Sequence, residues 1–340
     1  MSDARFIDYL GAAADFFGPG AMEVPQYQSE ITDLVRRRGA FGQRLRKVPA
    51  TGHPSRYFEQ TRIVKGAFQD PRNLQHNPGN DPTRRERVLH LKAIYAPINF
   101  GLFDVELTRQ QGAQFSMLVA KDLNDAVEGC LLVSDQALWN GSDTDLAVPA
   151  TSEYVGLINQ INRTATIAST ASIVDGLAAE VADMMADENF NVRPTAIYMN
   201  PILCNLVDQE ERLNHRQMPQ APNEVIAGLR VPGIATTAGI LPLIPDWSLK
   251  NGASGASSTE SSKTDYKAMI ITESLIEYHY LTTPDPRVFV LGLEGNLQTR
   301  YAVVLFGAPV AKGKANAAQA QNTTETSLTT YPHSYVTIVR

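Results

Sequence analysis

The stretch "RPTAIYMNPILCNLVDQEERL", Arg193–Leu213, joins a short apolar strand to an amphipathic helix. Ile197–Met199 has the apolar composition of a buried strand. Asn200 can cap the exposed N–H groups of the following helix, and Pro201 suits the first helical turn because its φ is preset and it lacks a donor. Three interpretations are open at this point: a catalytic elbow, a ligand pocket, or a structural corner in which Asn200 and Pro201 form the helix cap.

The composition is that of an ordinary globular protein. The 340 residues are 43% apolar and 19% charged, which favours neither disorder nor a membrane protein, and the length allows one large domain or two to three smaller ones. The N-terminal stretch carries Asp3, Asp8 and Asp15 and lacks the order of a signal peptide. No uncharged run reaches the roughly 18 residues of a membrane span. We therefore expect a soluble, non-secreted protein without a membrane partner.

The charge is divided unequally along the chain. Residues 1–100 hold 15 Lys and Arg against 10 Asp and Glu, whereas the remainder holds 15 against 26, within a net charge of −6. The basic part could form a solvated surface, pair with acidic groups of a neighbouring subunit, or face a polyanion. Overall acidity and the lack of interleaved aromatic residues argue against nucleic-acid recognition, although non-specific phosphate contact stays open. We favour inter-subunit contacts through Arg36, Arg37, Arg38, Arg44, Arg62, Lys65, Arg84, Arg85 and Arg87.

Two segments at the start of the chain lack enough apolar residues for a core of their own. Residues 1–48 hold short helical patterns around a Gly-Pro-Gly break. In Thr51–Asn99, "SRYFEQTRIVKGAF" and the returning "TRRERVLHLKAIYAPINFG" predict two strands on either side of a tip rich in proline and glycine. A long two-stranded hairpin is marginal in isolation. Both segments are therefore expected to rest on the rest of the chain or on a neighbour.

Helical and strand patterns alternate through the rest of the chain. Thr108–Asn140 has apolar residues at three- and four-residue steps and no proline, which predicts one spine helix of roughly 50 Å beneath a sheet. Thr166–Glu188 predicts a second helix with one apolar side. The last third is β-rich, with strands such as "RVFVLGL" and "QTRYAVVLFGAPVA" separated by polar loops. The expected fold class is α+β.

Signatures of catalysis are missing from the sequence. It contains no GxSxG elbow, no HExxH, no GxGxxG after a strand and no phosphate-binding loop. The six histidines have no second ligand at a suitable spacing, and His279 is expected to be a surface or inter-strand residue. Cys130 and Cys204 are expected to be buried, reduced thiols. We predict no enzyme, no cofactor and no metal site, so Asn200 is expected to form a structural corner; an α/β hydrolase-like enzyme is the distant alternative.

The order of these segments resembles the major capsid proteins of tailed double-stranded DNA bacteriophages, which have the HK97-like fold. "RPTAIYMNPILCNLVDQE" is similar to that family's strand-to-helix segment, "GIATTAGILPLIPD" to its following loop and strand, and "RYAVVLFGAPVAKGK" to its closing strands. The resemblance implies an N-terminal arm, an extended hairpin called the E-loop, a P-domain with the spine helix, an A-domain, and return strands of both domains. The corresponding ranges are 1–48, 49–99, 100–151, 152–300 and 301–340.

The resemblance also implies a function. The chain would form hexamers and pentamers that tile the icosahedral virion shell around packaged double-stranded DNA, after synthesis in the bacterial host cytoplasm. Its implied partners are other copies of itself, a portal, decoration proteins and the DNA, contacted non-specifically. Some relatives begin with a scaffolding region that a protease removes, whereas this chain reaches the arm at once, so we expect a separate scaffolding protein. An encapsulin-like shell of a bacterial nanocompartment, assembling unaided around cargo, is the alternative.

Overall fold

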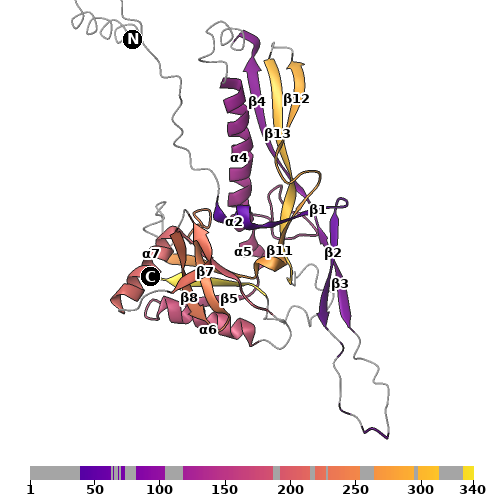
Figure 1. Cartoon of the computed structure of the whole chain (residues 1–340). Helices are drawn as coiled ribbons and strands as arrows, with labels where there is room; N and C mark the ends of the chain where they lie inside the picture. The colour runs from indigo at the N-terminus through magenta and orange to yellow at the C-terminus, as the bar shows by residue number, and fades with distance from the viewer. Residues whose placement is uncertain are drawn as a thin grey trace, which may run out of the picture.

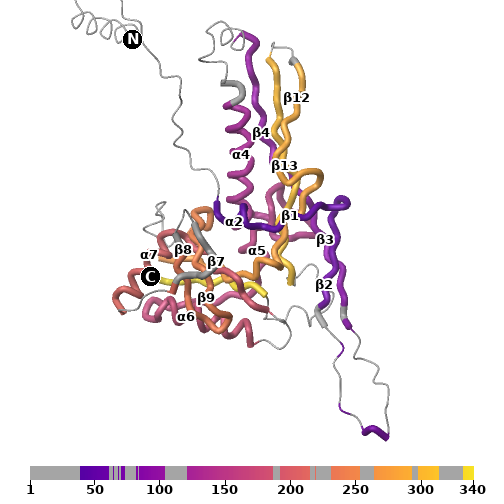
Figure 2. Tube along the Cα trace, viewed as in Figure 1, coloured from indigo at the N-terminus to yellow at the C-terminus, as the bar shows by residue number. Residues whose placement is uncertain are grey.

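The chain forms three parts that project in different directions: a rod, a broad lobe and a hairpin (Figures 1 and 2). The computed structural model describes residues 39–62, 64, 68, 70–72, 82–103, 118–186, 192–214, 219–226, 229–252, 264–294, 298–313 and 332–340. Most of the predicted arm, residues 1–38, lies outside the described residues.

The rod is a five-stranded sheet with one long helix packed against it. Its strands are β1 (Arg46–Pro49), β11 (Ile276–Tyr280), β13 (Gln298–Ala311), β12 (Arg287–Glu294) and β4 (Lys92–Gly101). The first part of β13 lies between β4 and β12, and its last part pairs with β11. Helix α4 (Leu118–Asn140) packs on β4 and β13, and its 23 residues span roughly 35 Å. The predicted start at Thr108 lies outside the described residues.

The lobe contains a mixed sheet and an apolar core of its own. Helices α6 (Ile173–Met185) and α7 (Pro201–Leu213) contribute Leu177 and Leu203, both fully buried, to this core. The strands, in order across the sheet, are β5 (Thr164–Ile167), β14 (Ser334–Val339), β10 (Asp265–Ile271), β6 (Ala196–Met199), β9 (Gly239–Pro245), β8 (Leu229–Thr236) and β7 (Gln220–Ile226). All four residues of the central strand β6 are buried, which explains its uninterrupted apolar sequence.

The corner between β6 and α7 is built by Asn200 and Pro201. The Asn200 Oδ1 atom accepts a hydrogen bond from the Ile202 N–H at 3.0 Å, and Pro201 occupies the first helical turn. The Asn200 Nδ2 atom also donates to the Leu249 carbonyl at 3.0 Å. A cavity of about 380 Å³ lies between α4 and β4, and its lining does not include this corner. Asn200 therefore ends one element and starts the next, as a structural corner does.

The second predicted helix, Thr166–Glu188, is too long at its start. Thr164–Ile167 is strand β5, parallel to β14, and α6 begins at Ile173 with Ser172 as its cap. The Ser172 Oγ atom accepts from the Asp175 N–H at 3.3 Å. Short apolar runs fit a strand as well as a helix, so periodicity alone could not place this boundary.

The hairpin consists of β2 (Ser55–Arg62) and β3 (Thr83–Leu89), which pair antiparallel. The sequence predicted one returning strand from Thr83 to Gly101, and this prediction is wrong. The chain leaves the hairpin after Leu89, and β4 joins β13 in the rod instead. Figure 2 shows the hairpin pointing away from the end of the rod at which β12 lies. The returning segment thus belongs to two sheets.

The described end of the arm is anchored in an apolar core to which both the rod and the lobe contribute. Helix α2 (Ala40–Arg44) places the buried Phe41 ring 4.3 Å from that of Trp139, between centroids. The Phe41 N–H donates to Asp246 at 2.9 Å, and the Gly39 N–H donates to Asp135 at 2.8 Å. These bonds fix the point at which the chain enters the body. Two further short elements are α5 (Leu157–Gln160) and the 3₁₀ turn η2 (Glu273–Leu275).

Candidate functional site: the hairpin junction

The basic residues selected from the sequence lie on different elements where the structure describes them. Arg36–Arg38 and Lys65 lie outside the described residues, and Arg62 lies on β2. The Arg44 Nε atom is 2.9 Å from Glu273 of the same chain. Arg84, Arg85 and Arg87 lie together on β3, where Arg84 is exposed, Arg85 half-buried and Arg87 buried.

Arg87 anchors the hairpin within its own chain. Its side chain is 4% exposed, and its Nε atom is 3.0 Å from Glu59 Oε2 on β2. Glu59 Oε1 also accepts a hydrogen bond of 2.8 Å from the Gly313 N–H, just beyond β13. Arg87 is therefore paired within its own chain, and removing it would take the charged partner from a nearly buried carboxylate.

A second set of contacts joins the foot of β2 to β11. The Ser55 Oγ atom lies 2.9 Å from His279 Nδ1, and His279 Nε2 lies 3.3 Å from Glu277 Oε2. Ser55 and His279 are only 4% and 5% exposed. Of the two expectations for His279, a surface or an inter-strand residue, the structure shows the second: the side chain is buried, and the residue lies on β11 between β1 and β13. We call the set Ser55, Glu59, Arg87, Glu277, His279, Lys312 and Gly313 the hairpin junction.

The charges around Glu277 set the protonation state of this junction. Glu277 Oε1 is 2.8 Å from Lys312 Nζ and 3.5 Å from Arg46 Nη1. Burial favours a raised Glu277 pKa, but hydrogen bonds and charges of Lys312 and His279 outweigh it and hold that pKa below its ordinary value. Burial lowers the pKa of His279, against the opposing effect of Glu277. At neutral pH the junction therefore holds an ionised Glu277 and a neutral His279.

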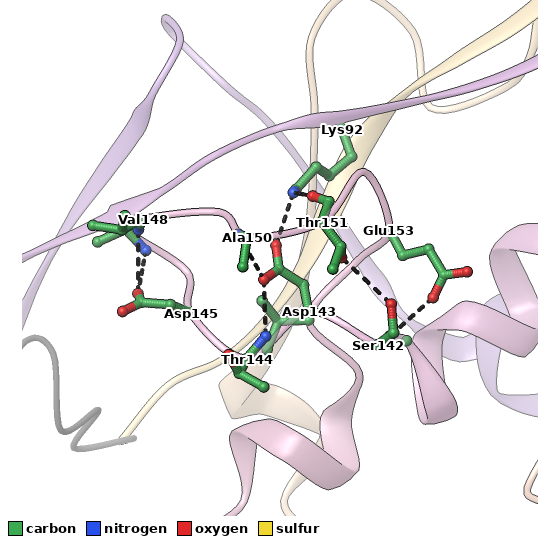
Figure 3. A network of polar contacts seen from close by, with 12 residues as sticks. Lys92, Ser142, Asp143, Thr144, Asp145, Val148, Ala150, Thr151 and Glu153 are labelled. Carbon is green, nitrogen blue, oxygen red and sulfur yellow. Dashed lines mark hydrogen bonds and ion pairs between the residues drawn. The ribbon is translucent and has the colours of Figure 1, made fainter.

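A third contact fixes the chain where it leaves the hairpin. Lys92, the first residue of β4, donates to Asp143 Oδ2 at 2.8 Å and to the Thr151 carbonyl (Figure 3). Asp143 Oδ1 accepts from the N–H groups of Thr144 and Ala150 at 2.9 and 3.1 Å. Burial favours a raised Asp143 pKa, but Lys92 and the two N–H donors lower it below its ordinary value. Asp143 thus ties the loop after α4 to the base of the hairpin.

The junction holds a serine, a histidine and a carboxylate in series, which is the order of a nucleophile, a base and an orienting acid. Catalysis requires a substrate carbonyl to reach the serine oxygen. Ser55 is almost completely buried by β11 and its own hairpin, so a substrate could not approach it. The arrangement joins two structural elements rather than forming a reaction site.

Large apolar side chains are exposed beyond the junction. The Phe58 side chain on β2 is 75% exposed, and Val290 on β12 is 67% exposed. β12 is an edge strand of the rod among the described residues. Apolar residues on an unpaired edge favour association with another chain. The exposed residues of this kind on the hairpin and rod include Phe58, Val64, Phe68, Tyr95, Val288, Phe289, Val290 and Leu291.

The described residues contain no group of three or more His, Cys, Asp or Glu arranged to hold a metal ion. Across the same part of the chain, no helix has both the length and the apolar character needed to cross a membrane. Cys130 is buried, but Cys204 is only half-buried, so the prediction of two buried thiols is right for one of them.

The sequence matches no protein-family model and no curated protein. The fold, in contrast, is similar to solved shell structures along nearly the whole chain. A chain in the head of Helicobacter pylori bacteriophage KHP40 has a TM-score of 0.60 at 9% identity, covering 95% of this chain and 96% of its own. A chain of Gordonia phage Cozz has a TM-score of 0.59 at 12% identity, covering 97% of this chain and 94% of its own. A chain of the holo-SrpI encapsulin complex from Synechococcus elongatus has a TM-score of 0.56 at 14% identity, covering 96% of this chain and 94% of its own. The chain therefore has the HK97-like fold.

Sequence reasoning missed most of the junction. Ser55 and Glu59 were parts of a strand, and Glu277 and Lys312 carried no motif. His279 stood out as one of six histidines, but its partner Ser55 is 224 positions away. The available signal was the buried-strand pattern of "IEYHYL", in which polar residues require partners.

Proposed function

We propose that this chain is a structural, non-catalytic shell subunit, the major capsid protein of a tailed double-stranded DNA phage. The observation that carries the proposal is the combination of the HK97-like fold with a hairpin that stands away from the body and exposes Phe58, with Val64 and Phe68 also exposed just beyond β2. A two-stranded hairpin gains stability when a neighbouring subunit covers it. Burial of a few hundred Å² at about 25 cal/mol per Å² gives several kcal/mol for each neighbour.

The proposal extends to the organisation of the chain and its partners. Residues 1–48, 49–99, 100–151, 152–300 and 301–340 would serve as arm, E-loop, P-domain, A-domain and return strands. The subunit would form hexamers and pentamers with the help of a separate scaffolding protein, and bind a portal and decoration proteins. The basic first hundred residues, with exposed Arg84, suit contacts with acidic neighbours and a shell around a polyanion.

Electron microscopy of the purified chain, with and without co-expressed phage proteins, tests this function. We expect particles with sixfold and fivefold capsomers when a scaffolding protein is present. A monomer under every condition would contradict a shell function. Uniform closed shells from the chain alone would instead favour a nanocompartment, the class to which the similar encapsulin belongs.

A substitution on the hairpin tests the carrying observation directly. Phe58→Asp should leave the subunit folded, because the side chain is exposed, but should prevent capsomer formation by placing a charge in the contact. Leu213→Asp, at an exposed position on α7, is the matched control and should assemble normally. Normal shells from Phe58→Asp would refute a role for this face of the hairpin.

A further inference from the structure

The foot of the hairpin is held through a histidine whose hydrogen-bond roles depend on its protonation. Glu277 is ionised and can only accept, so the neutral His279 carries its proton on Nε2 and donates it to Glu277. Nδ1 is then the acceptor, and the Ser55 hydroxyl donates to it across 2.9 Å. Protonation turns Nδ1 into a donor, so the Ser55 hydroxyl has to rotate and accept from it, and the ring gains a positive charge in a buried site.

The surroundings of His279 do not favour a second positive charge. Lys312 and Arg46 already face Glu277 from the end of β13 and from β1. On the β2 side lie Ser55 and the Tyr57 ring, 6.2 Å from the His279 ring, and burial raises the Tyr57 pKa so that the phenol stays neutral. Glu59 is paired with Arg87. A protonated His279 at Glu277 Oε2 would thus be the third cation around one carboxylate, because Lys312 and Arg46 already face its Oε1 atom in a site where His279 is buried.

We propose that Ser55, His279 and Glu277 form an acid-sensitive latch: neutral His279 holds the foot of β2 against β11, and its protonation loosens the hairpin from the rod. The latch would change the mobility of the hairpin, which we assign to contacts between subunits. Its use in shell assembly rests on the proposed function, whereas the latch itself is a property of the single subunit.

The direction of the pH dependence follows from linkage. Burial lowers the His279 pKa below its ordinary 6.5, so the closed junction binds fewer protons than the open one. The contribution of His279 is complete above about pH 6.5 and decreases as the pH falls towards the lower pKa of the closed state. Glu277 acts in the same direction at lower pH, because its pKa is also depressed.

Hydrogen–deuterium exchange of the full-length, dispersed subunit tests the latch. Peptides from β2 and β3 are compared with peptides from α6 at about pH 7.5 and about pH 5.5, after correction for intrinsic exchange rates. We expect protection of the hairpin to fall by on the order of tenfold in acid, while α6 changes little. An acid response of equal size in both regions, or none in the hairpin, would overturn the proposal.

Two variants identify the titrating group. His279→Gln keeps a donor and an acceptor but does not titrate, so the acid response of the hairpin should disappear. His53→Gln, at an exposed histidine near the hairpin, should retain the response. If His279→Gln does not fold, Ser55→Ala replaces it and should loosen the hairpin already at neutral pH. Persistence of the full acid response in His279→Gln refutes the latch, and so does wild-type protection of the hairpin amides at neutral pH in Ser55→Ala.

The shell function is tested separately in the same wild-type preparation. If electron microscopy shows no particles after a scaffolding protein is added, the shell function is contradicted, whereas the latch is not.

Discussion

The seven-stranded lobe and the hairpin are stabilised by different interactions. In the lobe, Leu177, Ile197 and Leu203 are completely buried between the sheet and its helices. The hairpin has backbone pairing between β2 and β3, an exposed Phe58, and polar contacts concentrated at its foot. The lobe therefore contains its own core, whereas the position of the hairpin depends on a few directional bonds. Substitutions in the lobe should change global stability, and substitutions at the junction should change local opening.

The largest effect on global stability is expected for Leu203→Ala. This α7 side chain has no exposed surface, so truncation removes apolar burial and leaves a cavity, at a cost of about 2–5 kcal/mol in the free energy of unfolding. Leu213→Ala on the same helix is the control, because Leu213 is 80% exposed, and it should change stability by less than about 0.5 kcal/mol. Urea unfolding measures both, and equal effects would show that the lobe does not depend on this core.

Arg87→Met tests whether the hairpin opens independently of the lobe. The substitution keeps much of the apolar volume but leaves the buried Glu59 without its 3.0 Å ion pair. We expect exchange of the β2 and β3 amides to accelerate at least about tenfold, while the global free energy of unfolding changes by less than about 1 kcal/mol. Arg84→Met, at the exposed arginine three residues earlier, should leave exchange unchanged. A global loss as large as that of Leu203→Ala would mean that hairpin and lobe unfold together.

The same contrast explains what the sequence could predict. The corner at Asn200 and most of the spine helix follow from local signals: a capping residue, a proline in the first turn, and apolar residues at helical spacing. The HK97-like fold followed from the order of such segments. Local signals also identified the hairpin as a segment without its own core, because its residues alternate around a proline-rich tip.

The hairpin junction could not be predicted because its contacts depend on the order of strands in space. Ser55 meets His279 only because β2 begins beside β11, and Glu59 meets Gly313 only because β13 ends at the same place. The transfer of β4 to the rod is of the same kind, since its alternating pattern fits the hairpin and the rod equally well. Pairing partners of strands are not encoded in the period of either strand.

Asp143→Asn should have an intermediate effect at the base of the hairpin. The substitution removes the charge that Lys92 and two N–H groups stabilise, and we expect a loss of about 2 kcal/mol at neutral pH. The Asp143 pKa is depressed in the folded state, so its contribution is present above its ordinary value and is lost as the pH falls through the folded pKa. Wild type and variant should therefore converge in strong acid.

Urea titrations across acidic and neutral pH measure this convergence. Asp145→Asn is the control in the same loop, because Asp145 is half-buried and accepts from the N–H groups of Ala147 at 2.8 Å and Val148 at 3.3 Å, whereas Asp143 has Lys92 as a partner (Figure 3). It should cost less than Asp143→Asn at neutral pH. A difference between wild type and Asp143→Asn that stays constant down to strong acid would exclude the ionised Asp143 as the source of the stabilisation.

A smaller loss of global stability than for Leu203→Ala or Asp143→Asn is expected for Asn200→Ala, at the corner in the lobe. Loss of the cap to the Ile202 N–H should cost about 1 kcal/mol in the free energy of unfolding, and the buried bond to the Leu249 carbonyl moves the value upward. Asn200→Asp keeps the acceptor for the Ile202 N–H and loses the donor to the Leu249 carbonyl. The stability that this variant loses should therefore measure the bond to Leu249. Because Asn200 is buried and α7, which follows it, lies on the side of the lobe away from the hairpin (Figure 1), Asn200→Ala should still assemble. Loss of particles without loss of stability would place the corner in a subunit contact and remove the contrast between a self-contained lobe and a partner-dependent hairpin.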